Sequence, residues 1–199
     1  MWCGDLGAIY FIAYKCFFAI NVDMDCKELF RLYDRVNSAL GFANVDCAGR
    51  KCNFCENNIG HAFLFPLEDE YLNERTGAAV PSEDVAYDGF TVKMLGISEA
   101  TGRCGFFEDG RCATQKLKPI ECKLYPLIFY ERGNSVNLEL DLRCPEAKKI
   151  DKNYIINILP AITELAEFLP KEYFIARREL PDEMGGKLKT SKVATLRKI

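Results

Sequence analysis

The sequence predicts an α+β fold: a small cysteine-rich metal-binding domain with a β-hairpin and flanking helices. Residues 136–142 alternate apolar and polar side chains, which is the pattern of a strand with one buried face. Residues 26–40 and 154–178 repeat apolar side chains every three or four positions, which is typical of amphipathic helices. We therefore expect a hairpin at 127–142 and the two helical segments to form the core, with the cysteine loops on one side.

The N-terminal part is expected to hold a buried apolar segment. Residues 6–20 are strongly apolar, but Lys15 interrupts them and the run is shorter than the ~20 residues that cross a bilayer. We favour a buried helix or strand pair over a membrane anchor, and expect no membrane span. Cys3 and Cys16 stand beside bulky apolar residues, where a thiol usually packs as a small hydrophobe.

The helix at 26–40 has recognisable ends. Asp25 is placed to cap it, Glu28 follows three residues later, and Gly41 can end it. Cys26 would lie in the first turn, where the helix dipole favours a thiolate. We interpret Cys26 as a structural cysteine, with metal ligation as the alternative.

The middle of the chain gives weaker patterns. An acidic start and a terminal glycine predict a short helix at 66–77, whose charges we interpret as a solvated face. Residues 78–88 are rich in turn formers, so we expect a loop, with a strand beginning at Phe90.

The hairpin is predicted from two runs and the loop between them. Residues 127–130 favour a strand, residues 131–134 favour a hairpin loop, and the alternation at 136–142 favours a second strand. Cys122 and Cys144 stand at the two open ends of this hairpin. Antiparallel pairing would therefore bring these two thiolates towards one another.

Helices are expected over 150–178, with Pro160 and Pro170 dividing the apolar pattern into two or three shorter helices. Residues 181–199 are mainly glycine, lysine and small polar types. Too few apolar side chains are present there to pack, so we expect a flexible basic tail.

Length and composition favour one domain in a reducing compartment. A chain of 199 residues can bury a core without disulfides, so we expect a single domain at 1–180 with its motif core at 47–144. Ten cysteines in 199 residues are about 5% of the chain, below the roughly 8–10% of a secreted disulfide scaffold, and no secretory signal is recognisable. A cytoplasmic location is therefore expected, where clustered cysteines more often bind metal than pair. The net charge of −3 gives no reason to expect nucleic-acid binding.

The strongest functional signal is the stretch CGFFEDGRCATQKLKPIECKLYP. Asp109-Gly110 can reverse the chain between Cys104 and Cys112, so that two thiolates face a common centre. Pro119 then stiffens the approach to Cys122. Thiolates are soft ligands that select zinc or iron–sulfur clusters over magnesium or calcium.

A second group of cysteines lies in the polar loop CAGRKCNFC, and one more follows in LRCP. A polar loop without apolar period has little reason to concentrate thiols unless a soft metal binds them. The predicted metal ligands are therefore Cys47, Cys52, Cys55, Cys104, Cys112, Cys122 and Cys144. His61, Glu56 and Cys26 remain open as further ligands, although a lone histidine beside an apolar run is more often packed.

These motifs resemble the YkgJ-type cysteine-cluster family, a zinc- or iron-chelating domain. Residues 104–126 match the second cysteine element of that family, with Lys118 and Lys123 where the family has arginine. Cys52 and Cys55 match the first element, and Glu56 stands where the family usually has another cysteine. The resemblance spans residues 47–144 and implies a metal-chelating protein.

The metal and the biological role stay open at this point. A single close C-x2-C pair with otherwise scattered spacings favours an iron–sulfur cluster, such as 4Fe-4S, slightly over zinc. Three classes of function follow: a metal- or cluster-binding protein for redox, sensing or metal handling; a protein lysine N-methylase using S-adenosylmethionine, as family relatives that modify flagellin imply; and a structural zinc module that binds a protein partner. No glycine-rich loop for a methyl donor is recognisable, and whether the chain is an enzyme is left open.

Overall fold

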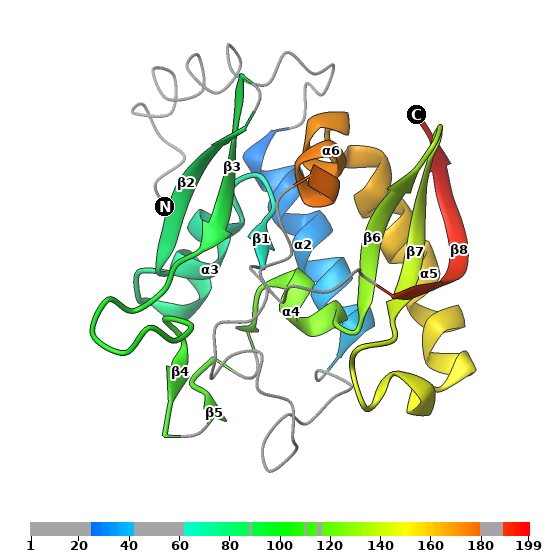
Figure 1. The fold of residues 1–199 in the computed structure, drawn as a ribbon. Coiled ribbons are helices and arrows are strands. Elements are labelled where there is room, and N and C mark those ends of the chain that lie inside the picture. The colour runs from blue at the N-terminus through cyan, green and yellow to red at the C-terminus, as the bar shows by residue number, and fades with distance from the viewer. Residues whose placement is uncertain (1–24, 42–61, 88, 110, 115–116, 180–188) are drawn as a thin grey trace.

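The computed structural model describes the chain in six segments, at residues 25–41, 62–87, 89–109, 111–114, 117–179 and 189–199. Within these segments the chain forms five α-helices and three small antiparallel sheets (Figure 1). The predicted α+β class is confirmed. The two three-stranded sheets stand on either side of the short helix α4 (Ile120–Leu124) in Figure 1.

The first described helix, α2 (Cys26–Leu40), begins and ends as its sequence predicts. The Asp25 carboxylate accepts a hydrogen bond from the Lys27 N–H at 3.3 Å, and Gly41 follows the last turn with a φ of +60°. The helix packs against α5 (Lys152–Phe168). The residues that α2 buries are Leu29, Leu32, Tyr33, Val36 and Leu40.

The first sheet joins β1 (Phe63–Leu64), β3 (Phe90–Leu95) and β2 (Ser82–Tyr87) in that order, all antiparallel. Helix α3 (Glu68–Thr76) connects β1 to β2 and ends at Gly77. This helix and the start of β3 confirm the prediction, but β2 lies in the segment predicted as a loop. Because β2 is an edge strand with mostly exposed side chains, it carries no apolar alternation that could reveal it.

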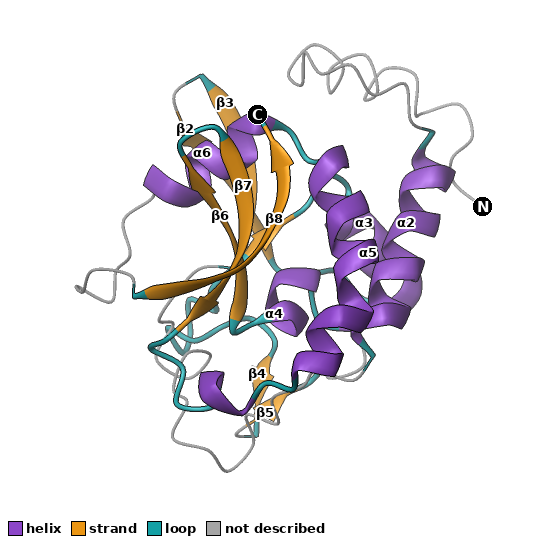
Figure 2. Cartoon of the chain, turned by 90° about the vertical axis from the view of Figure 1, so that its right-hand side faces the viewer, coloured by secondary structure: helices purple, strands orange, loops and turns teal. Residues whose placement is uncertain are grey.

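The third sheet contains β6 (Leu127–Arg132), β7 (Ser135–Asp141) and β8 (Thr190–Lys198) in that order. The predicted hairpin is confirmed, because β6 and β7 pair antiparallel through a turn at residues 133–134. In Figure 2 the helices α2, α3 and α5 stand together beside this sheet.

The expectation of a flexible basic tail at 181–199 is wrong for its last part. Residues 190–198 form β8, which pairs antiparallel with all of β7 through two register shifts. Leu196 is buried and Val193 packs, partly buried, against the core. Few apolar side chains are enough here because backbone hydrogen bonds to β7 hold the strand and only one of its faces needs covering. Residues 181–188 lie outside the described segments.

The apolar register of β7 holds only for its first half. Val136 and Leu138 are fully buried, as predicted. Leu140 is half-buried, however, and Leu142 is 44% exposed. The strand ends at Asp141, whereas the apolar alternation in the sequence continues to Leu142, one residue past the end of the strand.

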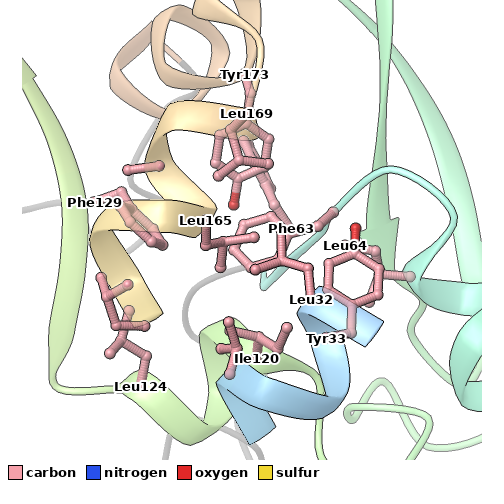
Figure 3. Packing of buried hydrophobic residues seen from close by; sticks show 14 of the residues in the cluster. Leu32, Tyr33, Phe63, Leu64, Ile120, Leu124, Phe129, Leu165, Leu169 and Tyr173 are labelled. Carbon is pink, nitrogen blue, oxygen red and sulfur yellow. The ribbon is translucent and has the colours of Figure 1, made fainter. Parts of the chain in front are cut away.

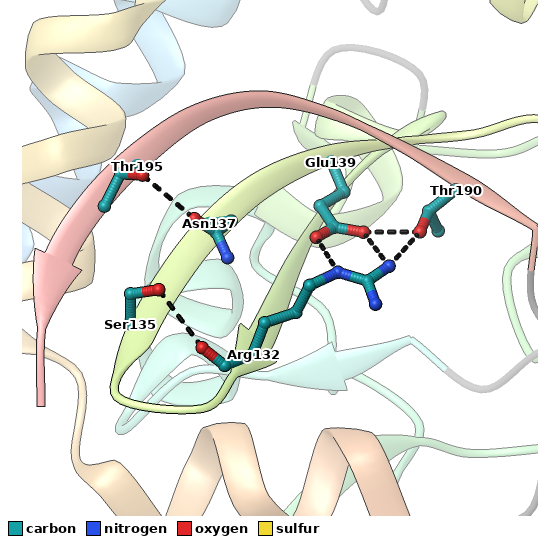
Figure 4. Close-up of polar contacts among 6 residues, drawn as sticks. All are labelled: Arg132, Ser135, Asn137, Glu139, Thr190 and Thr195. Atoms are coloured by element: carbon teal, nitrogen blue, oxygen red, sulfur yellow. Dashed lines mark hydrogen bonds and ion pairs between the residues drawn. The ribbon is translucent and has the colours of Figure 1, made fainter.

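The polar side of β7 is also buried, whereas the sequence predicts one buried face (Figure 4). The Glu139 carboxylate accepts hydrogen bonds from the Arg132 guanidinium at 2.6 and 2.9 Å, and another from the Thr190 hydroxyl of β8. The Thr195 hydroxyl likewise donates to Asn137 at 3.1 Å. A period of two cannot reveal such burial, because Thr190 lies 51 positions away in the sequence.

The two prolines in the C-terminal helical segment behave differently. Pro170 separates α5 from α6 (Lys171–Glu179), as expected. Pro160 lies inside α5 without ending it, which corrects the prediction. Pro160 has no N–H for the carbonyl of Ile156, and this missing hydrogen bond falls in a turn whose Ile156 is 64% exposed.

One core joins these elements (Figure 3). It contains the predicted contributors, α2, the hairpin, α5 and α6, and also β1 and α4, which the sequence patterns did not identify. The residues labelled in Figure 3 are Leu32, Tyr33, Phe63, Leu64, Ile120, Leu124, Phe129, Leu165, Leu169 and Tyr173.

Candidate metal centre

The candidate site is organised by α4, which carries Cys122. This helix has only five residues and begins after Pro119, whose fixed φ suits a helix start. Ile120 and Leu124 anchor one side of α4 in the core, with 0% and 2% exposure. The helix contacts α2, β1 and β6, so Cys122 is held on a short element that packs against three others.

Two carboxyl groups, the buried Glu68 and the partly buried Glu121, fix α4 to the rest of the fold. Glu68 accepts hydrogen bonds from the N–H groups of Phe65 at 2.9 Å and Ile120 at 2.6 Å. Glu121 accepts from the Phe63 N–H at 2.8 Å and from the Tyr173 hydroxyl at 2.6 Å. These contacts join α3, β1 and α6 to the helix that bears Cys122.

Cys104 and Cys112 lie in a compact turn region before α4. The small hairpin of β4 (Phe107–Glu108) and β5 (Arg111–Cys112) places Phe107 opposite Cys112, and the Phe107 N–H donates to the Cys104 carbonyl at 2.8 Å. The predicted chain reversal at Asp109 is confirmed, and Asp109 adopts a φ of +47°.

Gly105 allows this turn region to lie close against the first sheet. A Cβ atom at Gly105 would stand 2.5 Å from the Pro81 Cγ, which is too close for any side chain. The Gly105 N–H also donates to the Gly96 carbonyl at 3.0 Å. Cys104 therefore has a fixed backbone position beside the end of β3.

The structure brings Cys104, Cys112 and Cys122 into one neighbourhood. Burial raises the pKa of the Cys122 thiol well above its usual value, and the charges of Cys104, Glu121, Cys112 and Glu68 raise it further. Only groups close in space exert such an effect. Three of the seven predicted ligand cysteines thus converge from separate elements, and whether they bind a metal stays a prediction.

The position of Cys144 agrees with its expected place beside the hairpin. It lies in the turn between β7 and a short 3₁₀ helix (Ala147–Lys149) and is 3% exposed. The Asp141 N–H donates to the Pro126 carbonyl at 2.8 Å, so the segments leading to Cys122 and Cys144 leave the hairpin side by side. Direct proximity of these two sulfur atoms stays a prediction.

The remaining cysteine predictions fall largely outside the described segments. Cys26 is the first residue of α2 and is half-buried. Within the described segments, no three Cys, His, Asp or Glu side chains lie close enough to hold one metal ion. This absence is compatible with the electrostatic effect of Cys104 and Cys112 on Cys122, because thiolate charges act over longer distances than the roughly 2.3 Å of a zinc–sulfur bond. The predicted residues outside the described segments are Cys3, Cys16, Cys47, Cys52, Cys55, Glu56 and His61.

Glu68 is the residue of this neighbourhood that sequence reasoning missed. The acidic start of α3 was expected to be solvated, but Glu68 is 0% exposed and Asp69 is 7% exposed. Burial raises the pKa of Glu68 to about 8, although its two backbone hydrogen bonds oppose the shift. The only signal in the sequence is the apolar run FLFPL directly before it.

Tyr173 and Arg177 of α6 complete the surroundings of Glu121. Burial raises the pKa of Tyr173 well above its usual value, and its hydroxyl stays protonated and donates to Glu121. The Arg177 guanidinium lies 3.5 Å from the same carboxylate oxygen. Both oxygens of Glu121 are therefore engaged by protein donors, which suits a positioning role better than a ligand role.

No protein-family model, curated protein or solved structure matches this chain. The resemblance to the YkgJ-type family therefore stays a prediction that depends on the cysteine motifs. Among the described helices, none is both long and apolar enough to cross a membrane.

Proposed function

We propose that this chain binds an iron–sulfur cluster or a zinc ion through cysteine thiolates gathered beside α4, and that the bound group serves redox chemistry, sensing or metal handling. The observation that carries the proposal is that, besides burial, the charges of Cys104 and Cys112 from separate elements raise the pKa of Cys122. Soft sulfur donors gathered in one place are the ligands that zinc and iron–sulfur clusters prefer.

The electrostatics of this neighbourhood fit a cation. Burial disfavours the thiolate of Cys122 most, and the charges of Cys104, Glu121, Cys112 and Glu68 disfavour it further. A bound cation would reverse this balance, because it stabilises thiolates and offsets their repulsion. The thiolate of Cys122 is therefore disfavoured when no cation is present and would be favoured by a bound soft metal cation.

The chain's own contribution is to position the donors. Helix α4 holds Cys122, the β4–β5 hairpin holds Cys112, and Cys47, Cys52, Cys55 and Cys144 are the proposed additional ligands. When bound, an iron–sulfur cluster supplies one-electron chemistry, whereas zinc supplies a redox-inert crosslink. Thiolate ligands require reduced cysteines, so we also propose a cytoplasmic location.

The test is anaerobic purification followed by metal analysis and an ultraviolet–visible spectrum. Iron with sulfide and a broad visible absorption would identify a cluster, and stoichiometric zinc with no colour would identify a zinc site. Cys112→Ser and Cys122→Ser should each lose most of the metal, whereas Cys3→Ser should keep it. Protein that contains neither metal after anaerobic purification and cannot be loaded with either would contradict the proposal.

A further inference from the structure

The outer edge of β2 is open within the described part of the chain. β2 is the last strand of its sheet, and in Figure 1 it lies on the side of β3 that faces away from β1. All six of its residues pair with β3 in one register without a shift. This edge therefore has neither a bulge nor an internal proline, which are common means of protecting an edge strand.

The register shows which backbone groups of β2 point outwards. The Gly96 N–H donates to the Pro81 carbonyl at 2.8 Å, so every second residue of β2, counted from Pro81, exchanges hydrogen bonds with β3. Ser82, Asp84 and Ala86 lie between those residues, and their N–H and C=O groups point away from β3. No hydrogen bond to a described residue uses these outward groups. The side chains of these three residues are exposed as well.

The surface beside this edge is acidic. Lys93 is the cross-strand neighbour of Asp84, but its ammonium group forms an ion pair with Asp69 of α3. Glu70 follows Asp69 on α3, and the exposed Glu83 adds a carboxyl group on the other face of β2. Carboxyl groups therefore outnumber ammonium groups among the described side chains here. This excess favours a basic partner and disfavours pairing of two β2 strands, which would bring the carboxylates of two copies together.

The core side of β2 offers apolar contact. Val85 and Tyr87 lie on this side, where both are half-buried and pack against the core. Their cross-strand neighbours are Val92 and Phe90, which continue the apolar surface into β3. An added strand with apolar side chains on this side would cover what remains exposed of Val85 and Tyr87.

We propose that the open edge of β2 binds an extended segment of a partner protein, in which basic and apolar residues alternate, as a further strand of the first sheet. The outward backbone groups of Ser82, Asp84 and Ala86 supply the hydrogen bonds. The acidic surface beside Asp84 selects lysine or arginine, and the core side receives the apolar residues between them. This inference does not depend on the proposed metal centre.

The first measurement titrates the full chain with two labelled peptides of about nine residues, which is long enough to cover one strand. One peptide alternates lysine with valine and the other alternates glutamate with valine. Fluorescence anisotropy reports the dissociation constants. We expect the lysine peptide to bind at least ~10-fold more tightly at low ionic strength, with a difference that shrinks as salt is added.

Amide hydrogen exchange followed by NMR shows whether the peptide uses the backbone edge. In the free protein the N–H groups of Ser82, Asp84 and Ala86 should exchange quickly, whereas those of Glu83 and Val85 are protected by β3. A saturating concentration of the lysine peptide should slow exchange at the first three positions at least ~10-fold. The two positions that already pair with β3 should change little.

Ala86→Pro and Ala86→Ser form a matched pair of variants. Proline removes an N–H that points away from β3, so β2 keeps its pairing and the two variants should melt at similar temperatures. Ala86→Pro should bind the lysine peptide at least ~10-fold more weakly than Ala86→Ser, because it loses a backbone donor and its ring obstructs the edge.

A second pair of variants tests the charge. Asp84→Lys reverses the charge at the middle of the edge and should weaken binding of the lysine peptide about fivefold at low ionic strength. Glu167→Lys makes the same change at an exposed position on α5 and should bind the peptide nearly as the wild type does.

Several results would overturn the proposal. One is that the wild type binds the lysine peptide no more tightly than the glutamate peptide, a result that needs no variant to fold. Others are that the outward amides keep exchanging quickly at saturation, or that Ala86→Pro binds as tightly as Ala86→Ser. A concentration-dependent dimer in sedimentation that Ala86→Pro abolishes would assign the edge to a second copy of the chain instead.

Discussion

The carboxyl group of Glu68 accepts a hydrogen bond from the backbone N–H of Ile120 at 2.6 Å, although the two residues are 52 positions apart. This contact joins the first turn of α3 to the first turn of α4. A residue expected on a solvated face is therefore one of the groups that position the cysteine-bearing helix.

The first prediction concerns the pH dependence of stability. Folding raises the pKa of Glu68 from 4.5 to about 8, so the folded state holds this proton more tightly than the unfolded state. The resulting stabilisation is complete below pH 4.5 and is lost as the pH rises to about 8. Its size is on the order of 5 kcal/mol at most. Urea unfolding measured at several pH values between 4.5 and 9 should show the decline.

Glu68→Gln should remove that pH-dependent part of the stability. The amide should also cost about 1–3 kcal/mol at low pH, because only one of its two terminal atoms can accept from the Phe65 and Ile120 N–H groups. Glu74→Gln, at an exposed position on the same helix, is the control and should keep the wild-type pH profile. If Glu68→Gln and Glu74→Gln gave the same profile, Glu68 would not be the responsible group.

The second prediction concerns the support of α4 from α6. Tyr173→Phe removes the hydroxyl that donates to Glu121 at 2.6 Å and leaves this partly buried carboxylate short of one donor. We expect a loss of about 1–3 kcal/mol in the free energy of unfolding. Tyr130→Phe is the comparison, because no hydrogen bond in the described segments uses the Tyr130 hydroxyl, and it should change stability by less than about 0.5 kcal/mol. Equal losses would show that the Tyr173 hydroxyl does not support Glu121.

The third prediction compares two arginines with the same exposure. The side chains of Arg132 and Arg35 are both 54% exposed, but Arg132 pairs with the fully buried Glu139, whereas Arg35 pairs with Glu164, which is 48% exposed. Arg132→Met leaves a buried carboxylate without its main partner and should cost about 3–5 kcal/mol. Arg35→Met should cost about 1 kcal/mol or less. Chemical denaturation of both variants measures the difference in the free energy of unfolding. Similar losses would mean that the burial of Glu139 does not determine how much its ion pair contributes to stability.

Local patterns in the sequence were enough for elements whose signals are local. The Asp25 cap, the ending at Gly41, the turn at Asp109 and the hairpin all depend on residues within a few positions of each other. The strand β8 was not predicted, because backbone pairing with β7 holds it in place. Its few apolar side chains are interspersed with lysines, so they form no recognisable apolar pattern.

Long-range contacts account for what the sequence could not give about the candidate site. The cysteine motifs indicated where thiols gather, and the structure brings three of them together. The carboxyl of Glu68 and the hydroxyl of Tyr173 could not be placed there, because no periodic pattern relates α3 or α6 to α4. Only tertiary packing sets these neighbours.

The last prediction follows from the proposed metal centre. In the sequence, some of the proposed ligands precede α3 and the first sheet and the others follow them. A bound metal would therefore join segments that the unfolded chain keeps apart. Its binding energy would then become folding energy. Chelation under reducing conditions should therefore lower the melting temperature of the as-isolated protein by at least about 5 °C, since roughly 1 kcal/mol shifts a domain of this size by about 2–4 °C.

Two cysteine variants show whether the effect passes through α4. Cys122→Ser should melt near the temperature of the chelated wild type and respond little to the chelator, because the short helix between two prolines cannot offer another ligand in place of Cys122. Cys3→Ser should melt near the as-isolated wild type and keep its response to chelation. Thermal unfolding of all four samples, kept reduced throughout, decides the question: if chelation leaves the melting temperature unchanged, or if the two variants melt alike, the cysteines beside α4 do not hold a metal that stabilises this fold.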